Sequence, residues 1–207
     1  MRTDFDPEQL TYREFYQLLN SVVIPRPIAW VSTRSAAGID NLAPHSFYTV
    51  ACVRPPIVQF TSVGRKDSLR NIEQTGEFVV NLATEPMFEQ INACATDFPP
   101  DVGEFDAVGV AREPSNRVKP PRVAGSPVAL ECVLHSTVTL GDSTVVFGRV
   151  VYAAVESSVL EGAHPVSGRL APLARLGGEE WSSLGEIREI ERIRYRDWVG
   201  PPAQSAP

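Results

Sequence analysis

Two long strand-like runs that follow one another in the second half of the chain constrain the fold more than any other feature. They span Val128–Leu140 and Thr144–Val155. The residues between them, Gly141, Asp142 and Ser143, are typical of a hairpin turn. Paired strands of this length usually belong to a barrel or to a large curled sheet. The sequence therefore predicts a mainly β protein built around an antiparallel hairpin.

The stretch TSVGRKDSLRNIEQTGEFVVNL, residues 61–82, contains a strand end, a turn, a short helix and a second strand. The predicted strand Ile57–Thr61 leads into it. Asp67 is the predicted N-cap of the helix, because its carboxylate can accept a hydrogen bond from a free amide of the first turn. Gly76 lies where a left-handed C-terminal cap is expected. Residues 78–82 then alternate between two faces, as in a strand.

Arg65 and Lys66 directly precede this helix, which is an unusual place for two cations. The amino end of a helix carries a partial charge of roughly +0.5, so a cation there costs about 0.3–1 kcal/mol. An anion bound among the cations, the free amides and the hydroxyl groups of Thr61, Ser62 and Ser68 would explain the arrangement. A phosphate ester fits this set of donors. A solvated basic turn is the alternative, and this stretch alone slightly favours it.

The second informative stretch is Asn41–Val53, NLAPHSFYTVACV. Its end is strand-like, but Pro44 interrupts its beginning. Proline lacks a backbone donor and indicates a bulge or an edge strand, and bulges redirect side chains beside binding sites. Asn41, His45 and Ser46 place polar groups around this irregularity. A strand entry with polar residues facing solvent explains the same pattern equally well.

Composition and charge exclude several classes of function. With 207 residues, 43% of them hydrophobic, the chain has the size and composition of one soluble domain. We expect this domain to span residues 1–200 and a disordered tail to follow at 201–207. The net charge of −6 disfavours binding to nucleic acids and to anionic membranes. No apolar run approaches the roughly 20 residues that cross a bilayer, and the N-terminus, MRTDFDPEQL, does not resemble a signal peptide. We therefore expect a cytoplasmic protein.

The rest of the chain supplies further elements. Ile28–Thr33 is a predicted strand, and helices are predicted at residues 7–20 and 85–95. The spacing of Trp181, Leu184, Ile187 and Ile190 predicts a terminal helix. Residues 97–127, rich in proline, glycine and charge, predict a long surface excursion that acts as a lid or contacts a partner.

Several chemistries lack their sequence signatures. The chain has neither a GxGxxG dinucleotide motif nor a phosphate-binding P-loop. The three histidines do not have the sequence spacing of metal ligands, so no metal site is expected. The three cysteines are far apart and odd in number, which predicts buried free thiols. A nucleophilic pair of Cys52 and His45 is disfavoured, because seven residues along a strand place the two side chains on opposite faces. The other histidines and cysteines are His135, His164, Cys94 and Cys132.

Six motifs occur in one order over most of residues 20–180. They are RPIAWVST (26–33), NLAPHSFYTVACVRPPIV (41–58), RKDSLRNIEQTGEFVVNL (65–82), VKPPRV with SPVALEC (118–132), VVFGRVV (145–151) and PLARLGG (172–178). Together they resemble the flavin reductase-like family of FMN-binding split barrels. The resemblance implies an antiparallel split β-barrel with added helices, and a homodimer with FMN near the interface.

The resemblance also implies roles for individual residues. The phosphate of FMN would bind Ser62, Arg65, Lys66, Asp67 and Ser68. The ring and the ribityl chain would face Asn41, Leu42, Ala43, Pro44, His45 and Ser46. Trp30 would pack against the ring or fill the core, and Arg175 would contact the cofactor from the same or the partner chain. Relatives often carry a tyrosine where this chain has Trp181, which leaves the role of Trp181 open.

The activity that the resemblance implies is that of an FMN-dependent oxidoreductase. An NAD(P)H:flavin reductase, which can hand reduced flavin to a partner monooxygenase, is the leading hypothesis. Hydride can pass directly from a stacked nicotinamide to the flavin, so no catalytic side chain is nominated. An electron-transfer protein like flavoredoxin, without pyridine nucleotide activity, is the alternative, and an FMN enzyme with its own small substrate is a third. The choice between NADH and NADPH stays open.

Overall fold

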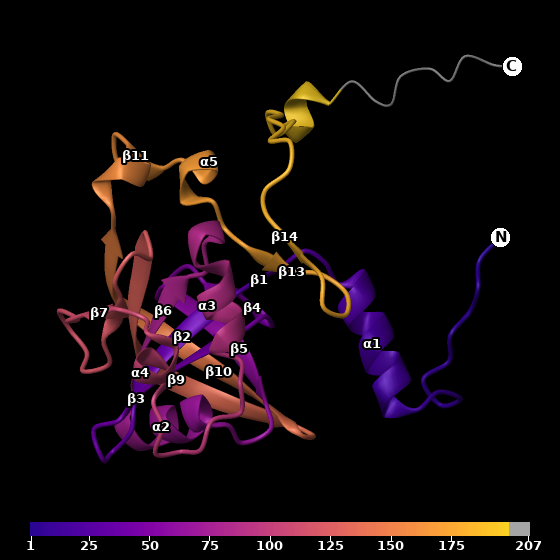
Figure 1. The fold of residues 1–207 in the computed structure, drawn as a ribbon. Coiled ribbons are helices and arrows are strands. Elements are labelled where there is room, and N and C mark those ends of the chain that lie inside the picture. Colours follow the sequence, from indigo (N-terminus) through magenta and orange to yellow (C-terminus); the bar gives the residue numbers. More distant parts are fainter. Residues whose placement is uncertain (199–207) are drawn as a thin grey trace, which may run out of the picture.

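The computed structural model describes residues 1–198 and is organised around one seven-stranded antiparallel sheet (Figure 1). The strand order is β3-β2-β6-β9-β10-β5-β4. This mainly β architecture with added helices confirms the predicted fold class. The strands are β2 (Ala29–Arg34), β3 (Asp40–His45), β4 (Tyr48–Cys52), β5 (Ile57–Val63), β6 (Glu77–Leu82), β9 (Val128–Leu140) and β10 (Ser143–Val155).

The predicted hairpin is confirmed as the pair β9–β10, with 13 residues in each strand. Two register shifts bend the hairpin, one of them beside Gly148. A Cβ atom on Gly148 would clash with the ζ carbon of Phe78. The glycine therefore allows the Phe78 ring to pack directly on the backbone of the hairpin.

The sheet curls, so that its two ends approach one another. The ring of His45, at the end of edge strand β3, lies 4.5 Å from the ring of Phe60 on β5. The backbone amide of Thr61 donates to the carbonyl of Phe47, just after β3, at 2.9 Å. The curled sheet surrounds a buried apolar cluster that includes Val31, Phe60, Phe78, Val80 and Val146.

Helix α2 (Asp67–Thr75) covers β2 and β3 with its buried residues Leu69 and Ile72. Gly76 ends the helix in the left-handed conformation, at φ 73°, as predicted. The prediction that Asp67 is the N-cap is wrong. Lys66 occupies the N-cap position and its side chain caps no amide of the described helix. Asp67 is the first helical residue, and its carboxylate pairs with Arg70 three residues later.

Pro44 lies inside β3 and directly opposite Trp30 of β2. The predicted bulge at Pro44 is therefore wrong, whereas the predicted edge position is confirmed, because β3 is the outermost strand on that side. A proline is tolerated on an edge strand because no further strand needs a hydrogen bond from its missing backbone N–H group. The irregular backbone follows at Ser46 and Phe47, between β3 and β4.

Helix α1 (Tyr12–Val22) begins later than predicted, because Thr11 and Glu14 form a capping box. Figure 1 shows α1 standing away from the sheet. The predicted helix 85–95 is divided into a 3-10 turn, η1 (Glu85–Met87), and α3 (Phe88–Ala93).

The predicted terminal helix is wrong. Trp181 and Ser182 instead form strand β14, and the chain then runs irregularly to the 3-10 turn η3 (Tyr195–Asp197). Pairing of β14 with β13 (Ala174–Arg175) outweighs the helical spacing of the apolar residues, because Trp181 packs edge-on against Phe88. The tail predicted at 201–207 lies outside the described residues.

The excursion at 97–127 contains α4 (Glu104–Val108) and the paired strands β7 (Arg112–Glu113) and β8 (Arg122–Val123). Within the described residues, no helix is long and apolar enough to cross a membrane, and no three side chains gather that could hold a metal. The remaining short elements are β1 (Arg26–Pro27), η2 (Ser157–Val159), β11 (Leu160–Glu161), β12 (His164–Pro165) and α5 (Ser167–Leu170).

Candidate functional site

A cavity of about 390 Å³ lies where the end of β3, the end of β5 and the start of α2 converge. Residues 94–98, Pro100 and Glu104, which follow α3, form its opposite wall. The structure brings ten of the predicted site residues together at this cavity. They are Asn41, Ala43, Pro44, His45, Ser46, Thr61, Arg65, Lys66, Asp67 and Ser68.

Four predicted residues lie elsewhere. Trp30 and Leu42 are fully buried in the core beside α3 and α4. Ser62 is buried, and its hydroxyl donates to the carbonyl of Gly64 at 2.9 Å. Arg175 lines a second cavity of about 380 Å³, together with Trp181. The two cavities share a rim at Tyr16, Pro44, Ser46 and Ala95.

The two cations before α2 line the first cavity and are held by exposed ion pairs. Arg65 pairs with Glu73 on α2 at 2.5 Å, and Lys66 pairs with Asp97 at 3.4 Å. Exposed pairs of this kind stabilise a protein by about 1 kcal/mol or less. Both cations can therefore exchange their partners for a more highly charged anion at little cost.

Glu104 is the main cavity residue that the sequence analysis missed. Its buried carboxylate accepts hydrogen bonds from the side-chain amide of Asn41, at 2.7 and 2.8 Å, and from the backbone amide of Leu42 at 2.8 Å. Burial raises the pKa of Glu104, and these hydrogen bonds oppose the rise. Acidic residues are common at the start of a helix, because they interact favourably with the helix dipole. The position of Glu104 in the sequence therefore does not indicate that its side chain is buried.

Both the nitrogen and the oxygen of the Asn41 side-chain amide form hydrogen bonds. Its nitrogen donates to Glu104, and its oxygen accepts from Ser68 at 3.1 Å and from Thr33 at 3.2 Å. Thr33 in turn accepts a hydrogen bond from Asn71 at 3.0 Å. Asn41 therefore joins β3 to α2 and α4, and fixes the amino end of α2 against the cavity.

His45 presents an unsatisfied polar atom in the cavity wall. The side chain is buried, and its Nε2 has no hydrogen-bond partner among the described residues. Burial, and after it the charge of Lys66, lower the pKa of His45 to about 4, although a hydrogen bond with the backbone of Thr61 opposes the shift. At neutral pH the imidazole is therefore uncharged, and its Nε2 is a buried polar atom that lacks a partner among the described residues.

Comparison with known protein families identifies the family of this chain. Residues 21–173 match the sequence model of the family described as flavin reductase like domain. The chain belongs to this family. The match confirms the resemblance found in the sequence motifs.

Solved structures agree with this flavin reductase-like assignment. Component B of nitrilotriacetate monooxygenase from Bacillus cereus is 30% identical, with a TM-score of 0.89 over 92% of this chain and 99% of that chain. The 2-nitrobenzoate 2-nitroreductase of Pseudomonas fluorescens is 28% identical, with a TM-score of 0.86 over 96% of this chain and 100% of that chain. A Shewanella frigidimarina protein with a split-barrel domain, 20% identical, has a TM-score of 0.84 over 93% of this chain and 100% of that chain. The fold is therefore a split barrel, as predicted.

The groups in the cavity of this flavin reductase-like protein fit a flavin nucleotide. A flavin ring carries nitrogen and carbonyl groups, and the buried Nε2 of His45 offers such groups one hydrogen bond. The cations Arg65 and Lys66 line the same cavity and suit a phosphate. The sequence analysis also missed Tyr16, which reaches the cavity from α1, because its spacing shows only an amphipathic helix.

Acidification is expected to destabilise the FMN-free protein through His45. The pKa is near 6.5 in the unfolded chain and about 4 in the folded one, so the unfolded state binds the proton more tightly. The stability that the neutral imidazole contributes is fully present above pH 6.5 and is lost as the pH falls towards 4. The loss amounts to about 3 kcal/mol in total, of which about 2 kcal/mol falls between pH 7 and pH 5. Urea unfolding at these two pH values measures it.

A matched pair of variants isolates this contribution. His45→Gln should lose most of the difference between pH 7 and pH 5, whereas His135→Gln, at an exposed position on β9, should keep it. An equal pH dependence in all three proteins would show that His45 is not the group responsible.

Proposed function

We propose that this protein is an FMN-dependent oxidoreductase that works as an NAD(P)H:flavin reductase. One observation carries the proposal: a single cavity is lined by both the cationic amino end of α2 and His45, whose Nε2 has no partner among the described residues. Donors for a phosphate and groups for a flavin ring therefore line the same cavity. When bound, FMN supplies the redox chemistry, and the protein supplies binding and orientation.

The residues of the cavity divide this work. Arg65, Lys66 and the free amides at the start of α2 bind the phosphate. His45 donates or accepts one hydrogen bond at the ring without adding a charge, because its imidazole is neutral at pH 7. The bonded pair of Asn41 and Glu104 keeps β3 and α4 at a fixed separation around the ligand. None of these roles requires proton transfer, so we nominate no catalytic side chain.

The proposed electron acceptor is a partner monooxygenase that takes up reduced flavin. The likeness to component B of nitrilotriacetate monooxygenase supports this partner. The proposed assembly is a homodimer. Its support is the apolar surface of α1 and the following residues, which projects from the sheet and leaves Tyr12, Leu19, Val22, Val23 and Ile24 exposed. Light scattering on the purified protein measures the assembly, and a monomer would remove this part of the proposal.

Two measurements on the purified protein test the activity. The visible absorbance spectrum, with FMN titrated in if the protein is colourless, should show saturable flavin binding. Oxidation of NADH and of NADPH is then followed with and without added FMN, and turnover with at least one nucleotide is expected. Flavin binding without turnover would leave the electron-transfer alternative, and a protein that ignores FMN would overturn the proposal.

A further inference from the structure

The second cavity is cationic, which is unexpected in a chain with a net charge of −6. Arg26 and Arg175 both line it, and none of the described residues in its lining is acidic. The lining also includes the aromatic residues Tyr16 and Trp181, and the apolar residues Ile28 and Pro44. The cavity thus combines two guanidinium groups with flat apolar walls.

Arg26 is buried without a counter-charge. The residue is 7% exposed. Its guanidinium donates to three backbone carbonyls, those of Asn20, Val23 (3.1 Å) and Leu176 (2.8 Å). Its Nε atom is buried and has no partner within the described part of the chain. Hydrogen bonds to neutral carbonyls alone compensate only part of the free energy that a buried cation loses when it leaves water.

Arg175 brings a second positive charge to the same place. β1 and β13 pair so that Arg26 lies directly opposite Arg175, and like charges in such a pair repel. Arg175 is held there by the ring of Trp181, with 4.6 Å between the guanidinium carbon and the ring centre, and by a 2.6 Å hydrogen bond to the carbonyl of Gly178. The fold therefore holds two arginines close together without an anion of its own.

We propose that Arg26 and Arg175 form an anion-binding subsite for the carboxylate of a small planar molecule that binds beside the flavin. Guanidinium groups bind carboxylates through paired hydrogen bonds, and an anion here would relieve both the unpaired burial of Arg26 and the repulsion between the arginines. The flat walls suit an aromatic or conjugated body. The inference rests on the proposed function for one point only, because the subsite lies beside a flavin only if FMN occupies the first cavity.

Size and position favour a small molecule. The cavity volume of about 380 Å³ lies near the lower end of the roughly 300–1,000 Å³ typical of ligand pockets. The shared rim at Pro44 and Ser46 leads to the part of the first cavity that contains His45. A molecule whose carboxylate is held by the arginines therefore extends towards the proposed position of the flavin ring.

The test compares a charged probe with its uncharged counterpart. Calorimetric titrations of benzoate and of benzamide are made on the FMN-loaded and on the FMN-free protein. We expect benzoate to bind at least tenfold more tightly than benzamide. Arg175→Gln should remove most of this preference, because it removes one charge-assisted contact. Arg169→Gln is the matched control, since Arg169 also donates to a carbonyl, that of Leu160, but lies outside both cavities.

The outcomes separate this inference from the proposed function. Equal binding of benzoate and benzamide, or an unchanged preference in Arg175→Gln, would overturn the carboxylate subsite and leave flavin binding untouched. Adenosine monophosphate is the third probe. If it binds the parent protein, binds Arg175→Gln more weakly, and benzoate does not bind, the carboxylate assignment is wrong and the arginines hold a nucleotide phosphate. Failure of FMN to bind, with the preference for benzoate intact, would overturn the proposed function alone.

Discussion

Replacing Arg65 and Lys66 together with alanine is expected to weaken FMN binding by about two orders of magnitude. Each charge-assisted hydrogen bond to a phosphate contributes about 1.5–3 kcal/mol. The lower value applies here, because the two side chains are 66% and 55% exposed and must first leave Glu73 and Asp97. Two losses of about 1.5 kcal/mol correspond to a factor of roughly 100 in Kd. Fluorescence titration with FMN measures the change.

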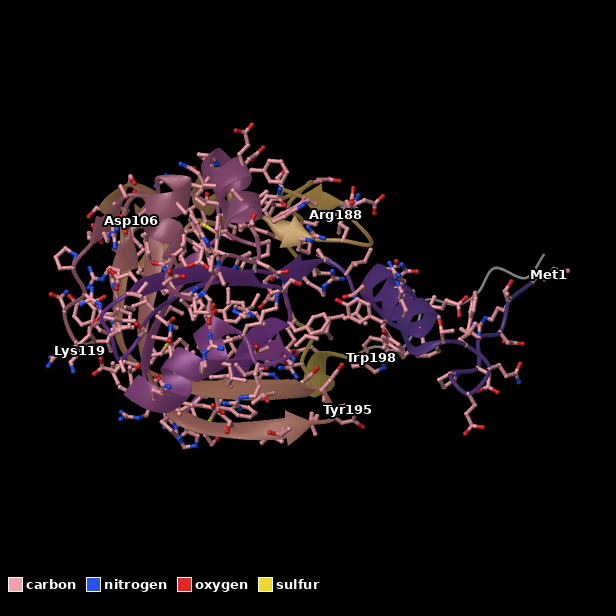
Figure 2. The ribbon with its side chains drawn as sticks, turned by 60° about the horizontal axis from the view of Figure 1, so that its bottom comes forward. Met1, Asp106, Lys119, Arg188, Tyr195 and Trp198 are labelled. Carbon is pink, nitrogen blue, oxygen red and sulfur yellow. The ribbon has the colours of Figure 1, made fainter. Side chains whose placement is uncertain are left out.

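Two controls show whether the loss comes from the phosphate. Riboflavin, which lacks the phosphate, should bind the variant and the parent protein equally. Replacing Arg117 and Lys119 with alanine removes the same charge at exposed positions outside both cavities, and should leave FMN binding unchanged. Lys119 lies at the end of the molecule opposite Met1 (Figure 2). If the Arg65 and Lys66 variant binds FMN as tightly as the parent, the basic turn is a solvated surface feature.

The cavity could be predicted largely from sequence because its parts are local. The cations, the hydroxyls and the start of α2 lie within eight residues, and the end of β3 is one further short stretch. Local sequence spacing does not show which polar groups are buried and already hydrogen-bonded within the protein. Asn41 and Ser68 both line the cavity, but their mutual hydrogen bond and the link to Glu104 depend on contacts between distant segments.

Two predictions of local structure are wrong, and for different reasons. The helical spacing from Trp181 to Ile190 is real, but pairing of β14 with β13 and the packing of Trp181 on Phe88 decide the conformation of its first residues. Asp67 has the chemistry of an N-cap, yet it pairs with Arg70. For Trp181 the deciding contact comes from a distant residue, Phe88, whereas Asp67 pairs with a residue three positions along its own helix. The hairpin β9–β10, whose partners adjoin in sequence, was predicted almost to the residue.

Glu131→Ala is expected to destabilise the protein by about 3–5 kcal/mol, the usual effect of removing one partner of a buried ion pair. The residue is 0% exposed on β9. Its carboxylate accepts hydrogen bonds from Arg122 and from the backbone amides of Asn116 (2.9 Å) and Arg117 (2.6 Å). The alanine variant leaves the buried guanidinium of Arg122 and two amides without this acceptor. Urea unfolding at pH 7 measures the loss.

The hydrogen bonds at Glu131 also predict how acid affects this pair. Burial by itself would raise the pKa of Glu131, but the hydrogen bonds from Asn116, Arg122 and Arg117 outweigh it and hold the pKa below its ordinary value. A lowered pKa in the folded state means that this stability is present above about pH 4.5 and is lost as the pH falls below it. This pH range lies below most of the pH range in which the contribution of His45 is lost. The contributions of Glu131 and His45 to stability can therefore be separated.

A control carboxylate and a double variant complete the test. Glu186→Ala breaks an exposed pair with Arg188 and should leave the unfolding midpoint unchanged. Replacing Glu131 with leucine and Arg122 with methionine should recover part of the loss seen in Glu131→Ala, since no unpaired charge remains in the core. The recovery should be incomplete, because the amides of Asn116 and Arg117 still lack an acceptor. If Glu131→Ala unfolds at the same urea concentration as the parent, the pair does not hold the excursion 97–127 on the barrel.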